Sequence, residues 1–154
     1  MAEVKKILSI VASPVVSTAG AYVTGDALAA VLKVKDADLV ANNTAIVQSV
    51  VIIDQAKQSQ DLDVVFFSAN PSTTTFTARV AADIADADMT KIVGIINVFD
   101  WYAFSDNSAG ISETAALPIT TTDGQFWIGL VARGTPTFTA TTDIRVVINL
   151  LQEA

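Results

Sequence analysis

Carboxylates are the side chains best placed to do chemistry in this 154-residue chain, because it contains no histidine and no cysteine. That absence removes Ser-His-Asp triads, thiolate nucleophiles and Cys/His zinc sites. The densest acidic cluster is Asp83, Asp86 and Asp88. A calcium loop spaces its oxygen ligands at alternate positions and ends in a bidentate glutamate, whereas Met89 and Lys91 follow here. We interpret the cluster as a solvated turn, with a metal site as the alternative.

A second acidic group comprises Asp54, Asp61 and Asp63. Two carboxylates that flank a sugar would make a glycosidase, yet nothing nearby supplies a raised pKa or a sugar-stacking cleft. We interpret these residues as loop and strand-edge charges that discourage edge-to-edge pairing. Threonine is abundant, but a threonine nucleophile needs an activating base. We therefore predict a non-enzymatic protein that uses no cofactor.

Three aromatic residues follow Asp100: Trp101, Tyr102 and Phe104. They precede a polar stretch, residues 105–110, that ends in glycine. Three interpretations compete for them: packing in the core at a strand end, anchoring of a contact between subunits, and stacking against a carbohydrate.

Short segments rich in Val, Ile, Phe and Thr, separated by Gly, Pro, Asn or Asp, indicate β-strands. Such a series is typical of an all-β antiparallel sandwich, jelly-roll-like, with about eight strands and at most short helical turns. We expect the helical turns at residues 27–32 and 85–89. The predicted strands are residues 5–12, 45–54, 62–69, 74–81, 91–99, 117–121, 125–132 and 144–151.

Two local patterns refine this prediction. Asp123-Gly124 supplies the positive φ angles of a tight turn, so residues 117–121 and 125–132 are expected to form a hairpin. Residues 62–67 are bulky on both faces, which is expected where the outer face of a sheet meets another subunit. Phe67 therefore joins Trp101, Tyr102 and Phe104 as a predicted partner contact.

The composition is unusually apolar: 51% of the residues are hydrophobic and 16% are charged, with a mean hydropathy of +0.49. Burial of apolar surface against other chains explains this surplus best. Residues 7–25 lack charge, but Pro14 and several hydroxyl residues make the stretch too polar for a membrane span. The stretch mimics a secretory signal, against which Glu3 and Pro14 argue. The net charge of −7 and the scattered basic residues predict no nucleic-acid binding.

Seven short motifs occur in order along nearly the whole chain: residues 22–26 (YVTGD), 47–54 (VQSVVIID), 62–67 (LDVVFF), 70–76 (NPSTTTF), 88–94 (DMTKIVG), 130–138 (LVARGTPTF) and 143–146 (DIRV). In this pattern the chain resembles a family of small virion structural proteins of tailed bacteriophages. The resemblance implies a component of the phage particle, exposed on the outer surface of the head as a decoration or cement protein. Such proteins bind the major capsid protein and copies of themselves, often as trimers.

We therefore expect one β-sandwich domain, residues 1–154, in which residues 1–6 could form an N-terminal arm. The chain would be made in the host cytoplasm and reside in the virion, where it stabilises the head. Two alternatives remain open. One is a tail or neck component, and the other is a carbohydrate-binding module that uses Trp101, Tyr102 or Trp127.

Overall fold

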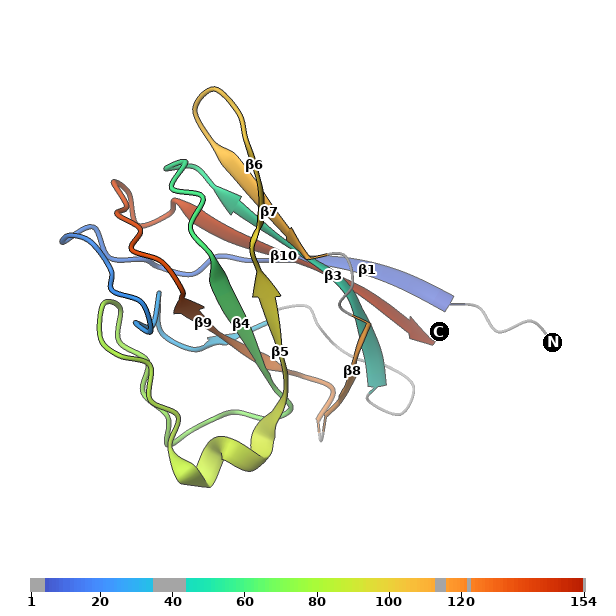
Figure 1. The fold of residues 1–154 in the computed structure, drawn as a ribbon. Helices are drawn as coiled ribbons and strands as arrows, with labels where there is room; N and C mark the ends of the chain where they lie inside the picture. The colour runs from blue at the N-terminus through green and yellow to red at the C-terminus, as the bar shows by residue number, and fades with distance from the viewer. Residues whose placement is uncertain (1–4, 35–43, 113–115, 122, 154) are drawn as a thin grey trace.

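Strands dominate the computed structural model, which describes residues 5–34, 44–112, 116–121 and 123–153 (Figure 1). A short 3-10 helix, η1, spans Asp86–Lys91. The strands are β1 Lys5–Ala12, β2 Leu32–Lys33, β3 Thr44–Asp54, β4 Leu62–Phe67, β5 Ile92–Val98, β6 Asp100–Ala103, β7 Ser108–Ser112, β8 Leu117–Thr120, β9 Trp127–Ala132 and β10 Ile144–Glu153.

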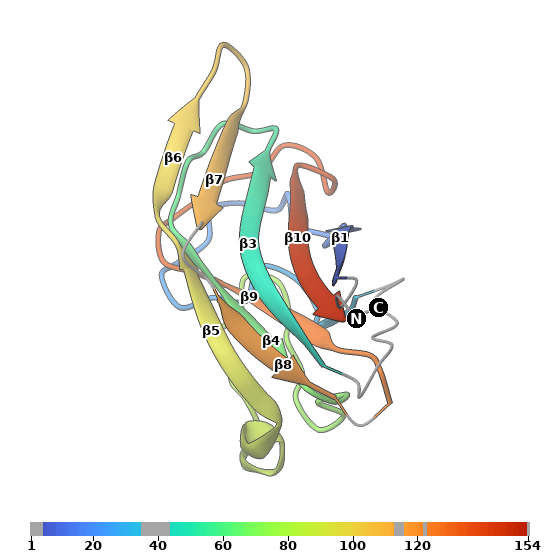
Figure 2. The same cartoon turned by 90° about the vertical axis from the view of Figure 1, so that its right-hand side faces the viewer.

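The strands form two antiparallel sheets. The six-stranded sheet has the order β1-β10-β3-β7-β6, and β8 pairs with the first half of β3 (Figure 2). The four-stranded sheet has the order β2-β9-β4-β5. The pairs are nested along the chain: β1 with β10, β2 with β9, β3 with β8 and β4 with β5. Nested pairs divided between two facing sheets define a jelly roll, and the prediction of an all-β sandwich of this type is confirmed.

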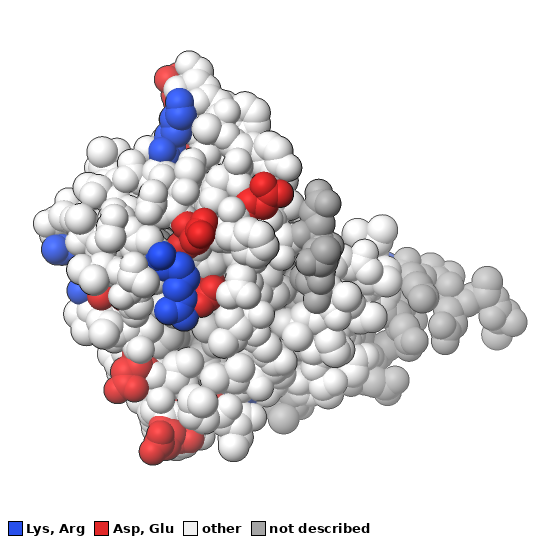
Figure 3. Space-filling model, in the orientation of Figure 1, with Lys and Arg blue, Asp and Glu red and all other residues white. Residues whose placement is uncertain are grey.

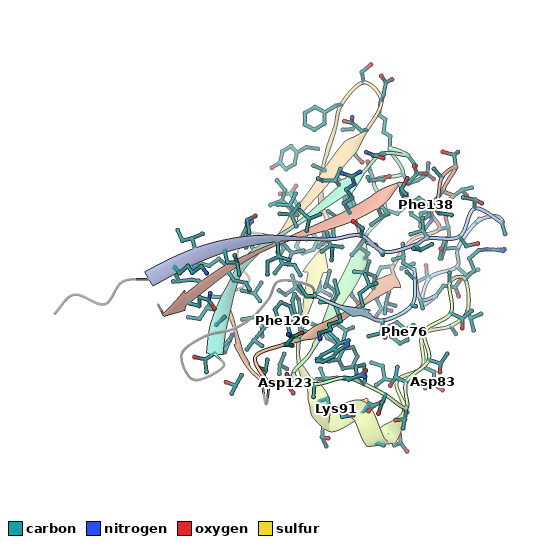
Figure 4. All side chains as sticks on the ribbon, turned by 180° about the vertical axis from the view of Figure 1, so that it is seen from behind. Phe76, Asp83, Lys91, Asp123, Phe126 and Phe138 are labelled. Carbon is teal, nitrogen blue, oxygen red and sulfur yellow. The ribbon has the colours of Figure 1, made fainter. Side chains whose placement is uncertain are left out.

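One core lies between the two sheets. Residues of alternating position on β10 point into it, and Ile144, Val146, Ile148 and Leu150 are each at most 2% exposed. Four aromatic side chains also lie in this cluster: Phe66 packs against Phe126, and Tyr22 meets Phe138 edge to face at 5.6 Å between ring centres. Phe126 and Phe138 occupy different parts of the same cluster (Figure 4).

The outer face of the four-stranded sheet is covered by the chain's own loops. Val65 and Phe67 of β4 lie in a second buried cluster with Ala27, Phe76 and Val131. β4 carries bulky side chains on both faces because residues of the same chain bury its outer face. The expectation that another subunit covers this face was wrong. Phe67 is fully buried and presents no surface to a partner.

Gly129 of β9 permits this cover to pack closely. A Cβ atom at Gly129 would lie 2.6 Å from Cε2 of Phe76, so only a glycine leaves room for the ring. Phe76 itself is 4% exposed. The loop that follows β4 therefore packs onto the sheet through Phe76, whose ring lies over Gly129.

Several local predictions were wrong. Residues 74–81 form an irregular segment with a turn at 78–80 rather than a strand, although Ala81 makes an isolated bridge with Asp26. Residues 27–32 are not a helical turn, because Ala27 bridges to Val131 and Leu32 begins β2. Strands β8 and β9 belong to different sheets, so the turn at Gly124, where φ is 79°, crosses the sandwich instead of closing a hairpin.

Two further differences concern short elements. The hairpin of β6 and β7, between β5 and β8, was not predicted. Lys5 and Lys6 belong to β1, where they pair with Glu153 and Gln152. Of the expected N-terminal arm, residues 1–4 lie outside the described residues. The expected helical turn at residues 85–89 coincides largely with η1.

Candidate interaction surface

The buried carboxylates hold loops together. Asp54 is 1% exposed, and its two oxygens accept hydrogen bonds from the backbone N–H groups of Ala56, Gln58 and Ser59 at 2.7–3.0 Å. These bonds stabilise a loop in which Lys57 and Ser59 adopt positive φ angles. Asp143 likewise accepts from the backbone of Thr139.

Asp88 is also buried, which contradicts its interpretation as part of a solvated turn. Its Oδ2 accepts hydrogen bonds from Thr73 Oγ1 at 2.7 Å and Thr74 Oγ1 at 2.8 Å, and its Oδ1 pairs with Lys91 Nζ at 2.6 Å. Burial alone would raise the pKa of Asp88, but the Lys91 ammonium and the threonine donors outweigh it and hold that pKa well below its usual range.

The other members of both acidic groups do not converge on a reaction centre. Asp83 and Asp86 are exposed, and within the described ranges no three His, Cys, Asp or Glu side chains gather as a metal-binding group. Asp63 accepts from Arg133 Nε and Asn97 Nδ2, so its carboxylate is paired, while Asp61 is exposed. The buried carboxylates of Asp54, Asp63, Asp88 and Asp143 therefore all bind loop or strand groups of the same chain.

The structure separates the predicted aromatic contacts. Trp101 points inward, packs against the main core, and would collide with a Cβ atom at Gly110. Tyr102 points outward and is 53% exposed. Phe104 is 59% exposed at the turn of the β6–β7 hairpin, where its N–H donates to the Asn107 carbonyl. Trp127 lies on the other sheet, with Lys33 Nζ 5.7 Å from its ring centre.

The outer face of the six-stranded sheet carries rows of apolar side chains in register. Strand pairing aligns Val11, Val147, Val51 and Ile111 across four adjacent strands. Two further rows lie on either side, and we call the outward side chains of all these strands the open sheet face. The flanking rows are Ile7, Leu151, Ile46 and Pro118, and Arg145, Ile53, Ala109 and Tyr102.

These side chains are half-buried or exposed, in contrast to those of the four-stranded sheet. Ile7 is 79% exposed and Val11 56% exposed. Neither buried cluster of the described residues includes a side chain of the open sheet face. Isolated exposed apolar residues are ordinary, but a contiguous patch of them marks an interaction site.

A polar row divides the open sheet face. Ser9 Oγ donates to Asn149 Oδ1 at 2.7 Å, and Asn149 Nδ2 donates to Ser49 Oγ at 2.8 Å. These two hydrogen bonds link the three side chains to one another, so the bonds are kept when another surface covers the row. The polar row is therefore compatible with burial in an interface.

A hollow adjoins the open sheet face at the Ile46 end of β3, where β8 and β10 flank that strand. Its volume is about 230 Å³, and its lining includes Ile46, Pro118 and Leu151. Gln152, which is buried, also lines the hollow, and neither of its amide atoms has a hydrogen-bond partner among the described residues. Elsewhere on the surface, in the view of Figure 3, acidic and basic side chains lie close to one another.

The open sheet face was not anticipated, although the sequence contained the signal. Residues 50–53 read Val-Val-Ile-Ile, with bulk on both faces, as residues 62–67 do. On β4 the chain's own loops cover the outward side, whereas on β3 none of the described loops does. The pattern indicates two apolar faces without telling what covers the second one.

Comparisons with known proteins place the chain in no family. No family model matches it, and no curated protein matches it. One solved structure, of turnip yellow mosaic virus, contains a chain with a TM-score of 0.35 and 14% identity, covering 99% of this chain and 95% of that one. The jelly-roll assignment rests on the strand pairing itself. Within the described part of the chain, no helix has both the length and the apolar character needed to cross a membrane.

Proposed function

We propose that this protein is a non-enzymatic structural component of a virion, a capsid decoration or cement protein that binds the major capsid protein on the outer surface of a phage head. The open sheet face is the observation that supports this most strongly. It offers contiguous apolar area on a chain whose buried carboxylates are held by structural contacts.

The physical role follows from that area. Packaged DNA pushes a shell outward, and a protein that buries apolar surface across the joints of the shell opposes the separation of its subunits. At about 25 cal/mol per Å², a few hundred Å² per contact contributes several kcal/mol before the cost of association. Repetition over a symmetric shell multiplies this contribution.

The β6–β7 hairpin is the proposed anchor on the capsid. It extends beyond the end of the sheet (Figure 1), and Tyr102 and Phe104 are both more than half exposed. Aromatic side chains are enriched among the residues that dominate binding energy. Trp101 supports the hairpin from the core side and is not proposed to touch the partner.

Rebinding of the chain to stripped heads tests this role. We expect the double variant Tyr102→Ser and Phe104→Ser to rebind at least about tenfold more weakly, because loss of a hot-spot aromatic costs about 2 kcal/mol or more. Met89→Ser is the matched control, since Met89 on η1 is 52% exposed and η1 lies at the opposite end of the molecule from the hairpin (Figure 1). Unchanged rebinding by the double variant would remove the hairpin from the contact.

Cryo-electron microscopy of particles that contain the chain decides among the alternatives. Density on the head supports the proposal, and density confined to the tail or neck replaces it with the first alternative. Glycan-array binding that disappears in Tyr102→Ala would favour the carbohydrate-binding module. The three candidate sugar-stacking residues Trp101, Tyr102 and Trp127 point to different places, which argues against a shared carbohydrate platform.

A further inference from the structure

We propose that the open sheet face binds the same face of a second copy of this chain, around a two-fold axis that runs along β3. This inference rests on the proposed function of an assembling subunit and names one partner of that surface. It differs from the trimer that the phage resemblance implies, because a face that binds itself generates a closed pair.

The apolar rows fit such a pair. Because β3 is the middle strand of the order β1-β10-β3-β7-β6, rotation about it places β10 opposite β7 and β1 opposite β6. Val147 of one copy then faces the strand that carries Ile111 in the other, and Val51 faces its own counterpart. β-Branched side chains of similar size interdigitate well between sheets packed about 10 Å apart.

The charges on the face are complementary under the same rotation. Among its described outward side chains, Arg145 on β10 and Asp100 on β6 are the charged ones, and they lie on opposite sides of β3. The axis brings the Arg145 side of one copy over the Asp100 side of the other. A second copy therefore supplies an acid for the Arg145 guanidinium, twice per pair.

The net charge of the chain and the area of the open sheet face also favour a second copy as the partner. The whole chain carries −7, yet the described side chains of this face include one acid and one base, so two copies meet where their mutual repulsion is least. Five strands spaced about 4.8 Å apart, with an average length of about eight residues, cover roughly 600 Å² in projection. A stable interface buries about 800 Å² per partner, so the sheet supplies most of that area.

Sedimentation velocity over a concentration series tests the pair. We expect a reversible monomer–dimer equilibrium for the natural chain, and an increase of at least about 100-fold in the dissociation constant for Val147→Asp, because a buried unpaired carboxylate is costly. Ile95→Asp is the matched control: Ile95 is also mid-strand and outward-facing, but lies on β5 and is 52% exposed. Circular dichroism verifies that both variants are folded.

A charge exchange tests the orientation without placing a carboxylate in the apolar rows. Arg145→Asp and Asp100→Arg should each weaken pairing about tenfold, and the double variant should restore it, since the opposed charges are then exchanged together. Absence of restoration, equal weakening by Ile95→Asp, a trimer mass, or a monomer up to about 1 mM would overturn the pair.

Failure of this inference is distinguishable from failure of the proposed function. A chain that remains monomeric yet rebinds stripped heads overturns the pair and leaves the structural role in place. A chain that pairs as expected yet ignores heads supports the two-fold contact and overturns the head assignment. Both measurements use the full chain.

Discussion

Buried aspartates hold the loops of this sandwich. Asp54, Asp88 and Asp143 each accept several hydrogen bonds from the backbone or hydroxyl groups of one loop, and Asp26 accepts from the N–H of Val23. A carboxylate can accept up to about four hydrogen bonds, so one side chain can fix a whole turn. In a chain without cysteine, these residues perform the restraining role that disulfides take in other small domains.

The lowered pKa of Asp88 makes stability depend on pH. A carboxyl group whose pKa is lower in the folded state contributes stability above its unfolded pKa of about 3.9, and that stability is lost as the pH falls through the folded value. We expect Asp88→Asn to reduce the free energy of unfolding at pH 7 and to make the loss between about pH 4 and pH 2 shallower. Urea unfolding at several pH values measures both effects.

The control for this prediction is Asp83→Asn. Asp83 is exposed, so its substitution should leave the free energy of unfolding nearly unchanged across the same pH range. If Asp88→Asn and Asp83→Asn gave the same pH profile, the cluster of Thr73, Thr74 and Lys91 around Asp88 would not stabilise the fold.

At the scale of elements, the loop that covers the outer face of the four-stranded sheet depends on the close contact between Phe76 and Gly129. Gly129→Ala introduces a Cβ atom 2.6 Å from the Phe76 ring, so either the ring or β9 must shift. Overpacking of this kind costs about 1–3 kcal/mol, which lowers Tm by roughly 2–12 °C in a chain of this length. Differential scanning calorimetry measures the change.

A second substitution identifies the cause. Phe76→Leu in the Gly129→Ala background should lose less stability than the two single changes together, because the smaller side chain relieves the collision. Strictly additive losses would show that Gly129→Ala destabilises the chain for another reason, such as strain within β9.

Alternation and turn residues predicted the long strands of this fold, because those strands bury one face. β10 shows this most clearly: Ile144, Val146, Ile148 and Leu150 point inward while Arg145 is exposed. Residues 74–81 have the composition of a strand but no neighbouring strand to pair with among the described residues. The Asp123-Gly124 turn is equally suited to a hairpin and to a crossing between sheets, and the sequence does not distinguish the two.

The candidate surface was predicted only in part. An aromatic group at Trp101, Tyr102 and Phe104 is visible in the sequence, but alternation along β6 turns Trp101 inward and Tyr102 outward. No strand is predicted from the sequence over residues 100–110, so this division could not be made in advance. The rows of the open sheet face depend on pairing between strands that are in places more than a hundred residues apart, as Ile7 and Leu151 are, which local patterns do not reveal.

At the scale of the whole molecule, the two sheets differ in how they are covered. Loops from two parts of the chain cover the four-stranded sheet, and the six-stranded sheet keeps an apolar outer face. Among its described side chains the open sheet face carries one acid and one base, so these add no net charge there, although the chain as a whole carries −7. Such a distribution favours solubility of the free chain and directs association to one side.

Salt should therefore strengthen the association of two copies. Each copy carries −7, and raising the ionic strength from 0.1 M to 1 M shortens the screening length from about 10 Å to about 3 Å. Long-range repulsion then falls, while the apolar contact is retained. We expect the dissociation constant to fall several-fold in sedimentation experiments, and a rise would show that the ion pairs dominate.

The pairing of Lys5 with Glu153 sets both described ends of the chain next to each other. They lie beside the Ile46 end of β3, whereas the β6–β7 turn extends past its Asp54 end, so the two features occupy opposite poles of the sheet (Figure 1). A cargo attached at either described end would lie at one pole, with the aromatic hairpin exposed at the other. The molecule thus has the layout of a display scaffold, with attachment and recognition separated by the length of a strand.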